Sequence, residues 1–97
     1  MKTNLEITKR NYGDYSSDNY GAHSLELHIG NLWLWFSYDT VVAFNDTGKL
    51  VVSKNCWKTT TGKHLNWIDG GNKKNRLERA EFEAQLAKTL KAHKLVV

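Results

Sequence analysis

The sequence predicts an α+β fold: an antiparallel sheet of about five strands with one C-terminal helix packed on one face. Two turn signals, Gly30-Asn31 and Asn45–Gly48, each lie between two segments with strand-like composition. Near the C-terminus the pattern changes, and apolar side chains recur every four residues, as they do along one side of a helix. These observations separate a sheet in the first half of the chain from a helix at its end.

The 97 residues are too few for more than one modest core, so we expect a single domain, 1–97. Within it we predict strands inside residues 4–54, a long packed connection over 55–76 and a helix over about 78–93. The first strand is indicated by Leu5 and Ile7, which alternate with polar neighbours.

The residues on either side of the first turn predict a two-residue β-hairpin, whose register follows from its apolar pattern. In this register Leu27 lies opposite Leu34 on one face, which we expect the helix to cover. His28 then lies opposite Trp33 on the other face.

Trp33 and Trp35 both belong to the face that a single helix leaves uncovered. Either the 55–76 connection packs over them and adds Trp57 and Trp67 to a second small core, or they form an exposed aromatic platform for a second copy or another partner. The first arrangement is favoured, because a chain this short rarely leaves two neighbouring tryptophans exposed.

Residues 55–76 show neither a clean helical period nor a strand period. A structureless loop of this length is uncommon in a compact domain, so we predict that it packs against the sheet or carries function. Its polar stretch, Thr59–Asn66, is interpreted as structural. The hydroxyls would satisfy backbone groups, Gly62 would take a positive φ, and His64 would fix the loop by hydrogen bonds.

The last element is predicted to be a helix that begins near Glu78. Leu77 and Phe82 stand at the spacing of a hydrophobic staple around this start. Phe82, Leu86 and Leu90 form one apolar stripe, which is expected to be core rather than a groove for a partner.

Composition limits the class of protein. The chain has one cysteine, Cys56, which excludes an internal disulfide and suits a reducing compartment. It has no run of eighteen apolar residues, and its first ten residues have no apolar signal-peptide core. We therefore expect a cytoplasmic protein without a membrane partner.

The net charge of +4 is unevenly distributed along the chain. Residues 1–48 contain three Lys and Arg against six Asp and Glu, whereas residues 49–79 contain eight against two. Such asymmetry can mark a contact surface. The candidate binding residues are cations and a histidine from the basic segment, together with the two tryptophans: Lys54, Lys58, Lys63, His64, Lys73, Lys74, Arg76, Trp33 and Trp35.

Known phosphate and metal motifs do not fit the basic segment. A P-loop requires Gly five residues before its Gly-Lys pair and Ser or Thr after it, whereas Trp57 and His64 occupy these positions. Cys56 and His64 are isolated, so the closely spaced Cys and His pairs of a zinc site are missing. We therefore predict neither a metal nor another cofactor, and we assign no catalytic residue.

An enzymatic alternative is a metal-free ribonuclease. His23 and His64 would act as base and acid, with Lys63 stabilising the phosphorane charge. Both histidines are explained equally well as hydrogen-bonding residues that fix loops. We expect that the protein is not an enzyme, and the ribonuclease remains the second alternative.

Several segments resemble a family of short, uncharacterised proteins of phages and other mobile elements. They are "NYGAH" (Asn19–His23), "FSYDTVVAF" (Phe36–Phe44) and "NCWKTTTGKHLNWID" (Asn55–Asp69), in this order and at these separations. "RLERAEF" (Arg76–Phe82) is similar to the start of that family's helix, where a proline or capping residue is expected in place of Glu78. The resemblance implies expression from a phage or prophage inside a bacterial cell, and it implies no catalytic residue.

We therefore expect a small phage or mobile-element accessory protein that acts by stoichiometric binding. The leading hypothesis is inhibition of a host defence complex, in the manner of an anti-CRISPR protein, and it rests on analogy. The partner would be a host protein or ribonucleoprotein complex, bound by a monomer or homodimer in the bacterial cytoplasm. A nucleic-acid-binding module that uses the basic 49–79 segment is the first alternative.

Overall fold

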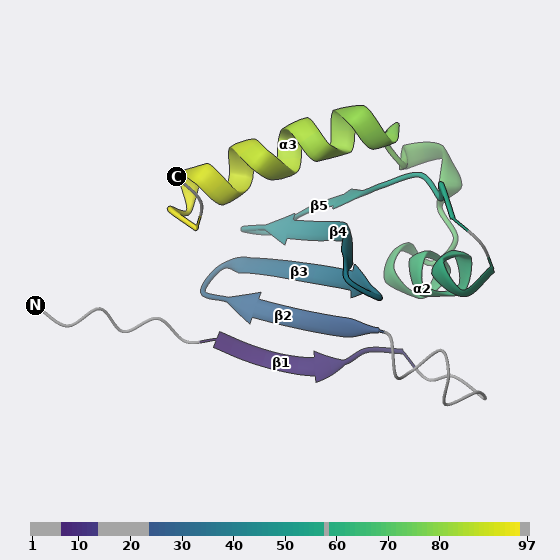
Figure 1. Cartoon of the computed structure of the whole chain (residues 1–97), viewed down its shortest axis with the longest axis horizontal. Helices are drawn as coiled ribbons and strands as arrows, with labels where there is room; N and C mark the ends of the chain where they lie inside the picture. The colour runs from purple at the N-terminus through teal and green to yellow at the C-terminus, as the bar shows by residue number, and fades with distance from the viewer. Residues whose placement is uncertain (1–6, 14–23, 58, 96–97) are drawn as a thin grey trace, which may run out of the picture.

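The computed structural model describes residues 7–13, 24–57 and 59–95, so the predicted strand residue Leu5 lies outside the described residues. In chain order the described elements are β1 (Ile7–Asn11), β2 (Leu25–Ile29), β3 (Leu32–Ser37), β4 (Thr40–Asp46), β5 (Lys49–Val52), α2 (Thr59–Asp69), the short 3-10 helix η1 (Lys73–Asn75) and α3 (Arg79–Ala92). The five strands form one antiparallel sheet in the order β1-β2-β3-β4-β5 (Figure 1). The predicted α+β fold is confirmed, with α2 as an additional helix.

The central hairpin has the register that its apolar pattern predicts. Four cross-strand pairs join β2 to β3, from Glu26 opposite Trp35 to Ile29 opposite Leu32. Gly30, in the turn, has a φ of 58°, which glycine adopts without the steric cost that a side chain would add.

One face of the sheet forms a core with α3. Leu77, Leu86 and Leu90 pack against this core, so the predicted staple and stripe both face the sheet. α3 runs along the strands in Figure 1, close to the predicted range. None of the helices that the structure describes is long and apolar enough to cross a membrane. The buried members of this core are Ile29, Leu32, Leu34, Phe44, Val51 and Phe82.

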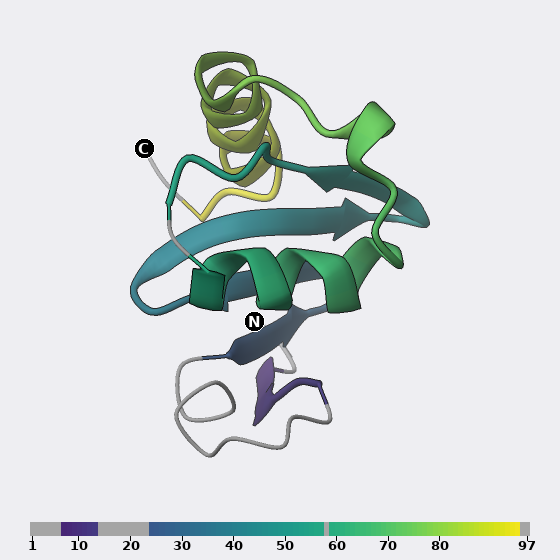
Figure 2. The same cartoon turned by 90° about the vertical axis from the view of Figure 1, so that its right-hand side faces the viewer.

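The connection after β5 is not an irregular loop, because residues 59–69 form α2. This helix packs on the opposite face of the sheet, and the two helices run in different directions (Figure 2). Thr61, His64 and Leu65 are buried, and Ile68 packs against the same cluster. These four positions follow the i, i+3, i+4, i+7 spacing of an amphipathic helix.

The helical period of α2 is hidden in the sequence because two of its four inward positions are polar. Threonine and glycine, which fill its first turn, also have low helix propensity. Ser37 compensates for the buried polar groups: its Oγ lies 2.8 Å from Thr61 Oγ1 and 2.7 Å from His64 Nδ1. Gly62 lies inside the helix without the predicted positive φ, and a Cβ there would lie 3.1 Å from Asn55 Nδ2.

The second core consists of Tyr12, Trp35, Val42, Ala43, Val52 and Leu65. The connection therefore covers Trp35, as the favoured interpretation expected. Trp57 and Trp67 are both exposed and are not buried members of this core, although the Trp67 ring lies 5.5 Å from that of Tyr12, centroid to centroid. Leu65 and Ile68 supply the apolar cover instead.

The chain between η1 and α3 extends the hydrogen bonding of the sheet beyond β5. Leu77 forms a parallel bridge with Ser53. The Leu77 N–H donates to the Val52 carbonyl, and the Lys54 N–H donates to the Leu77 carbonyl, both at 2.8 Å. This short segment therefore occupies part of the outer edge next to β5.

The β4–β5 turn holds a threonine in an unfavourable backbone conformation. Thr47 has a φ of 52°, which β-branched residues rarely adopt, whereas Asn-Gly is a preferred pair in two-residue hairpin turns. We expect Thr47→Asn to raise the free energy of unfolding, measured by urea denaturation, by about 1 kcal/mol. The lost hydrogen bond from Thr47 to Asp46 is exposed and contributes little. Thr40→Asn, outside the turn, should give no gain, and equal stability of Thr47→Asn and the native protein would contradict the argument.

Candidate functional site

The candidate binding residues from the sequence do not all converge on one site: Lys54, Lys73 and Arg76 line one cavity, and the other described candidates do not line it. His64, Arg76 and Trp35 are buried. The exposed candidates are Lys54, Lys63, Lys73, Lys74 and Trp33. His23 and Lys58 lie outside the described residues.

His64 lies in the middle of α2, with 0% of its surface exposed. Its Nδ1 is 2.7 Å from Ser37 Oγ, and its ring meets the Tyr12 ring edge-on with 5.6 Å between centroids. A partner or substrate cannot reach this imidazole without opening the second core. The candidate contact by His64 therefore does not fit the structure, whereas its predicted role in fixing the connection by hydrogen bonding does.

Arg76 is tied to the end of α2 by a buried ion pair. Its Nε lies 2.7 Å from Asp69 Oδ2, its Nη2 lies 2.9 Å from Asp69 Oδ1, and Asn66 accepts a further bond at 3.0 Å. Burial would raise the pKa of the Asp69 carboxyl, but hydrogen bonding and the charge of Arg76 outweigh it and hold this pKa below its usual value. Arg76 is thus a structural cation, and the predicted partner contact does not fit its position.

The exposed lysines are the accessible part of the basic segment. Lys54 pairs with Glu78, whereas Lys63, Lys73 and Lys74 make no ion pair with another described residue. A cavity of about 330 Å³ lies between the exit of β5, α2 and η1. Among the cations of its lining, Lys54 pairs with Glu78 and Arg76 pairs with Asp69. Lys73 is therefore the lining cation whose charge no described carboxylate offsets. Its lining residues are Lys54, Asn55, Gly62, Asn66, Lys73 and Arg76.

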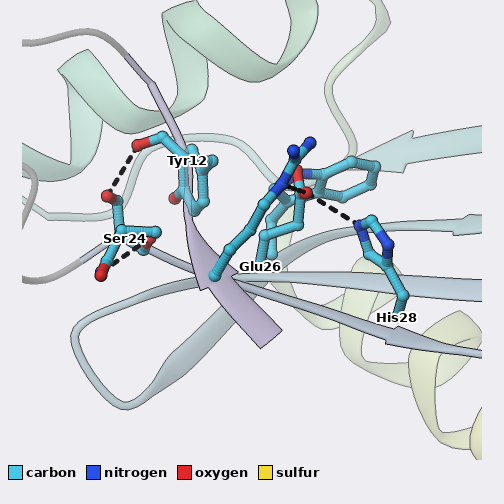
Figure 3. Close-up of polar contacts among 7 residues, drawn as sticks. Tyr12, Ser24, Glu26 and His28 are labelled. Atoms are coloured by element: carbon cyan, nitrogen blue, oxygen red, sulfur yellow. Dashed lines mark hydrogen bonds and ion pairs between the residues drawn. The ribbon is translucent and has the colours of Figure 1, made fainter. Parts of the chain in front are cut away.

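Glu26 is a buried carboxylate on the second face of the sheet, next to β1, with only 1% of its surface exposed. Arg10 Nε donates to its Oε2 at 2.5 Å, and His28 Nε2 lies 2.8 Å from the same oxygen (Figure 3). Trp35 Nε1 donates to Oε1 at 2.6 Å. Burial would raise the pKa of this carboxyl, but the hydrogen bonds from Arg10, Trp35 and His28 hold it below its usual value. The ionised carboxylate therefore joins β1, β2 and β3.

On the same face of the sheet, the next row of side chains lies further from α2, and α2 does not cover it. The ring of His28 stacks on that of Trp33, with 3.7 Å between centroids and 12° between planes. Trp33 is 39% exposed, so it fits the alternative of an aromatic contact surface, whereas the buried Trp35 does not. The strand register places this row across the sheet as Thr8, His28, Trp33, Asn45 and Leu50.

A second aromatic site lies where the β3–β4 turn approaches the start of α2. Tyr38, Cys56, Trp57, Thr60 and Thr61 line a cavity of about 610 Å³, which we call the Tyr38–Trp57 groove. Its two aromatic side chains are both exposed. Sequence reasoning assigned Trp57 to a core and did not identify this site.

Arg79, in the first turn of α3, holds the Trp57 ring from one side. Its guanidinium carbon lies 5.0 Å from the centroid of that ring. The guanidinium is itself fixed, because Nη1 donates to the Val41 carbonyl at 2.9 Å and Nε pairs with Glu83 at 2.8 Å. The contact with Arg79 therefore favours this orientation of the Trp57 ring before any ligand arrives.

Tyr38 has a φ of 56° in the two-residue turn between Ser37 and Thr40. Bulky side chains rarely adopt this conformation, and such strain tends to be retained at functional positions. The sequence does contain a signal: this turn has Tyr-Asp where glycine or asparagine is usual.

The described residues do not form a recognisable metal centre. Within 7–13, 24–57 and 59–95, no group of three or more His, Cys, Asp or Glu could hold a metal ion. Cys56 is exposed in the Tyr38–Trp57 groove, where its Sγ contacts the Lys54 carbonyl at 3.8 Å.

Comparison with known proteins gives a family but no characterised relative. No curated protein and no solved structure matches the chain. A family model matches residues 2–84, a range that contains each of the described strands, α2 and both of the aromatic sites described above. The chain therefore belongs to the family of unknown function DUF8033.

Proposed function

We propose that the protein acts by stoichiometric binding of a partner protein through the Tyr38–Trp57 groove. The observation that carries this proposal is the exposed Trp57 ring, fixed by Arg79 beside a strained Tyr38. Tryptophan and tyrosine are enriched among the residues that dominate binding energy at protein interfaces. Fixing an aromatic side chain in advance lowers the conformational entropy lost on binding.

The occupant of the groove would be an apolar side chain that projects from an acidic protein surface. The lining combines two aromatic rings with the small side chains of Cys56, Thr60 and Thr61, which suits an aliphatic or aromatic group. Lys63 is exposed on the same helix, and the chain as a whole carries +4. Acidic groups around the apolar side chain would complement this charge.

Charge pairing favours a protein partner over generic nucleic-acid binding by residues 49–79. The carboxylates of Asp69 and Glu78 offset Arg76 and Lys54. Fewer unpaired cations are therefore accessible than the sequence count of eight suggests. Salt dependence distinguishes the two kinds of contact. Binding to a polyanion would make log affinity fall with log salt by about 0.7–0.9 per phosphate neutralised.

Burial of His64 favours binding over the ribonuclease alternative. A general acid or base must come within hydrogen-bond reach of the substrate, and His64 is enclosed between Ser37 and Tyr12. The other histidine of that alternative, His23, lies outside the described residues.

The proposed setting is a bacterial cytoplasm, where the protein acts as a phage or mobile-element accessory factor and inhibits a host defence complex. The sequence resemblance supports this setting, and the fixed aromatic groove supports action by contact. Either a monomer or a homodimer can act in this way. The proposal requires one protein molecule for each target site.

The contact is tested by affinity measurements on a captured partner. Tagged protein is incubated with nuclease-treated bacterial host lysate, and the captured partner is purified and titrated by calorimetry. Trp57→Ala is expected to weaken binding by at least about 2 kcal/mol, or roughly 30-fold. Trp33→Ala is the matched control, because Trp33 and Trp57 are 39% and 38% exposed. Equal affinities of Trp57→Ala and the native protein would refute the groove as the contact.

The stoichiometry is tested by titrating the partner's activity with the protein. Stoichiometric inhibition gives a fall that is complete near one equivalent per site, whereas an enzyme acts far below one equivalent. Full inactivation at a small fraction of an equivalent would overturn the proposal.

A further inference from the structure

A third cavity lies beside Trp33, at the opposite end of the sheet from α2. Its volume is about 420 Å³, and Trp33 is the aromatic residue of its lining. The rest of the lining comes from the two hairpin turns, β2–β3 and β4–β5. We call it the Trp33 pocket, and its lining residues are Gly30, Asn31, Trp33, Asn45, Thr47 and Gly48.

The two turns that line the Trp33 pocket are joined to one another. The Thr47 N–H donates to the Asn31 carbonyl at 3.1 Å. The Gly48 N–H donates to Asn45 Oδ1 at 2.8 Å, which fixes that side chain. The pocket is therefore built on backbone that is already ordered by hydrogen bonds.

A chain of contacts also fixes the Trp33 indole. Arg10 and Trp35 donate hydrogen bonds to Glu26, and the Glu26 carboxylate is also hydrogen-bonded to His28 (Figure 3). The His28 ring then stacks against Trp33 from the β2 side. Asn45 lies across the sheet on the β4 side and lines the pocket, whereas His28 does not line it.

The lining of the pocket matches the chemistry of a nucleobase. A flat indole offers a stacking surface, and the side-chain amides of Asn31 and Asn45 offer hydrogen bonds to a polar base edge. The amide nitrogen of Asn45 makes no hydrogen bond with another described residue. An aliphatic side chain in the same place would bury such amides without partners, which is unfavourable.

We propose that the Trp33 pocket binds a nucleobase, stacked on the indole with its polar edge toward Asn45 and Asn31. Arg10 lies on the same face with 64% of its side chain exposed, but its charge is paired with Glu26 and it does not line the pocket. The base can belong to a free nucleotide or to a single strand of nucleic acid. This site is independent of the Tyr38–Trp57 groove, so either proposal can fail without the other.

Fluorescence anisotropy with a labelled short oligodeoxyadenylate tests the pocket, with unlabelled adenosine monophosphate as competitor. Trp33→Ala is expected to weaken binding roughly 5- to 100-fold, because stacking on an aromatic ring contributes about that much per base. Trp33→Phe should lose less, since it keeps an aromatic face. Trp57→Ala should bind like the native protein, because it alters an equally exposed tryptophan elsewhere.

Two further measurements separate base recognition from attraction to phosphate. An abasic oligonucleotide of the same length should bind much more weakly. Adenosine monophosphate should shift the side-chain amide resonances of Asn45 and Asn31 in a proton–nitrogen correlation spectrum. Competition by the mononucleotide identifies a free nucleotide as sufficient, whereas binding of the oligonucleotide alone identifies a single strand as the ligand.

The proposal is overturned by any of three results. The first is equal affinity of the native protein and a folded Trp33→Ala variant, with folding checked by circular dichroism. The second is equal binding of the abasic and intact oligonucleotides. The third is the absence of saturable binding of both the oligonucleotide and adenosine monophosphate to the native protein.

Discussion

Asp69→Ala is expected to lower the free energy of unfolding by about 3–5 kcal/mol, because it leaves the Arg76 guanidinium buried without its carboxylate. The two side chains are only 6% and 4% exposed, so water replaces the lost carboxylate poorly. Domains of this kind are stable by about 5–15 kcal/mol in total, which makes the loss a large fraction. Urea denaturation at pH 7 measures it directly.

An exposed ion pair of the same chemistry provides the control. Arg79 and Glu83 are four residues apart on α3, and the Glu83 side chain is 60% exposed. Glu83→Ala should therefore cost about 0.5 kcal/mol or less. If the two substitutions cost the same, the buried pair does not have the role assigned to it.

The same ion pair determines how stability depends on pH. Because the pKa of Asp69 is lower in the folded protein than its usual value, its contribution is fully present above about pH 4. The contribution is lost as the pH falls through the lower, folded-state pKa. The native protein should thus lose more stability than Asp69→Ala between pH 7 and pH 3.

Phe82→Ala is expected to destabilise the protein by about 3–5 kcal/mol, through lost burial and the cavity that remains. Phe82 is fully buried, and its ring lies 5.5 Å from that of Phe44, centroid to centroid. A helix of 14 residues is marginal by itself, so α3 depends on this packing. Thermal unfolding followed by circular dichroism should show one cooperative transition at a lower temperature.

Leu86→Ala, one turn further along α3, is the control for Phe82→Ala. Leu86 is only partly buried, so its truncation creates a smaller cavity and should cost less. A larger loss for Leu86→Ala than for Phe82→Ala would show that the core is centred elsewhere on α3.

The sheet and α3 could be predicted because local pattern and tertiary burial agree there. In the β2–β3 hairpin a two-residue turn sets the register, and a slip by one residue would exchange the two faces. Leu27 and Leu34 face the α3 core, and Trp35 belongs to the second core, as that register requires. In α3 the stripe is apolar at each inward position.

The second helix and the accessible sites could not be predicted because their burial depends on specific polar partners. His64 is buried through Ser37, which is 27 residues away in the chain, and no local pattern reveals that contact. Arg76 lies near exposed lysines in the sequence, but its side chain is buried in an ion pair with Asp69. Trp57 and Trp67 are apolar enough for a core, whereas Leu65 and Ile68 occupy that position in the structure.

The bridge between Leu77 and Ser53 has a consequence for self-association. A sheet with two open edges can recruit strands from other copies and grow into aggregates. Next to β5, the Leu77 segment already uses backbone groups of Val52 and Lys54. At the opposite edge, β1 carries Lys9 and Arg10, and like charges disfavour the approach of a second β1. The two edges are thus protected by different means, backbone pairing at one and charge at the other, and both act against edge-to-edge polymerisation.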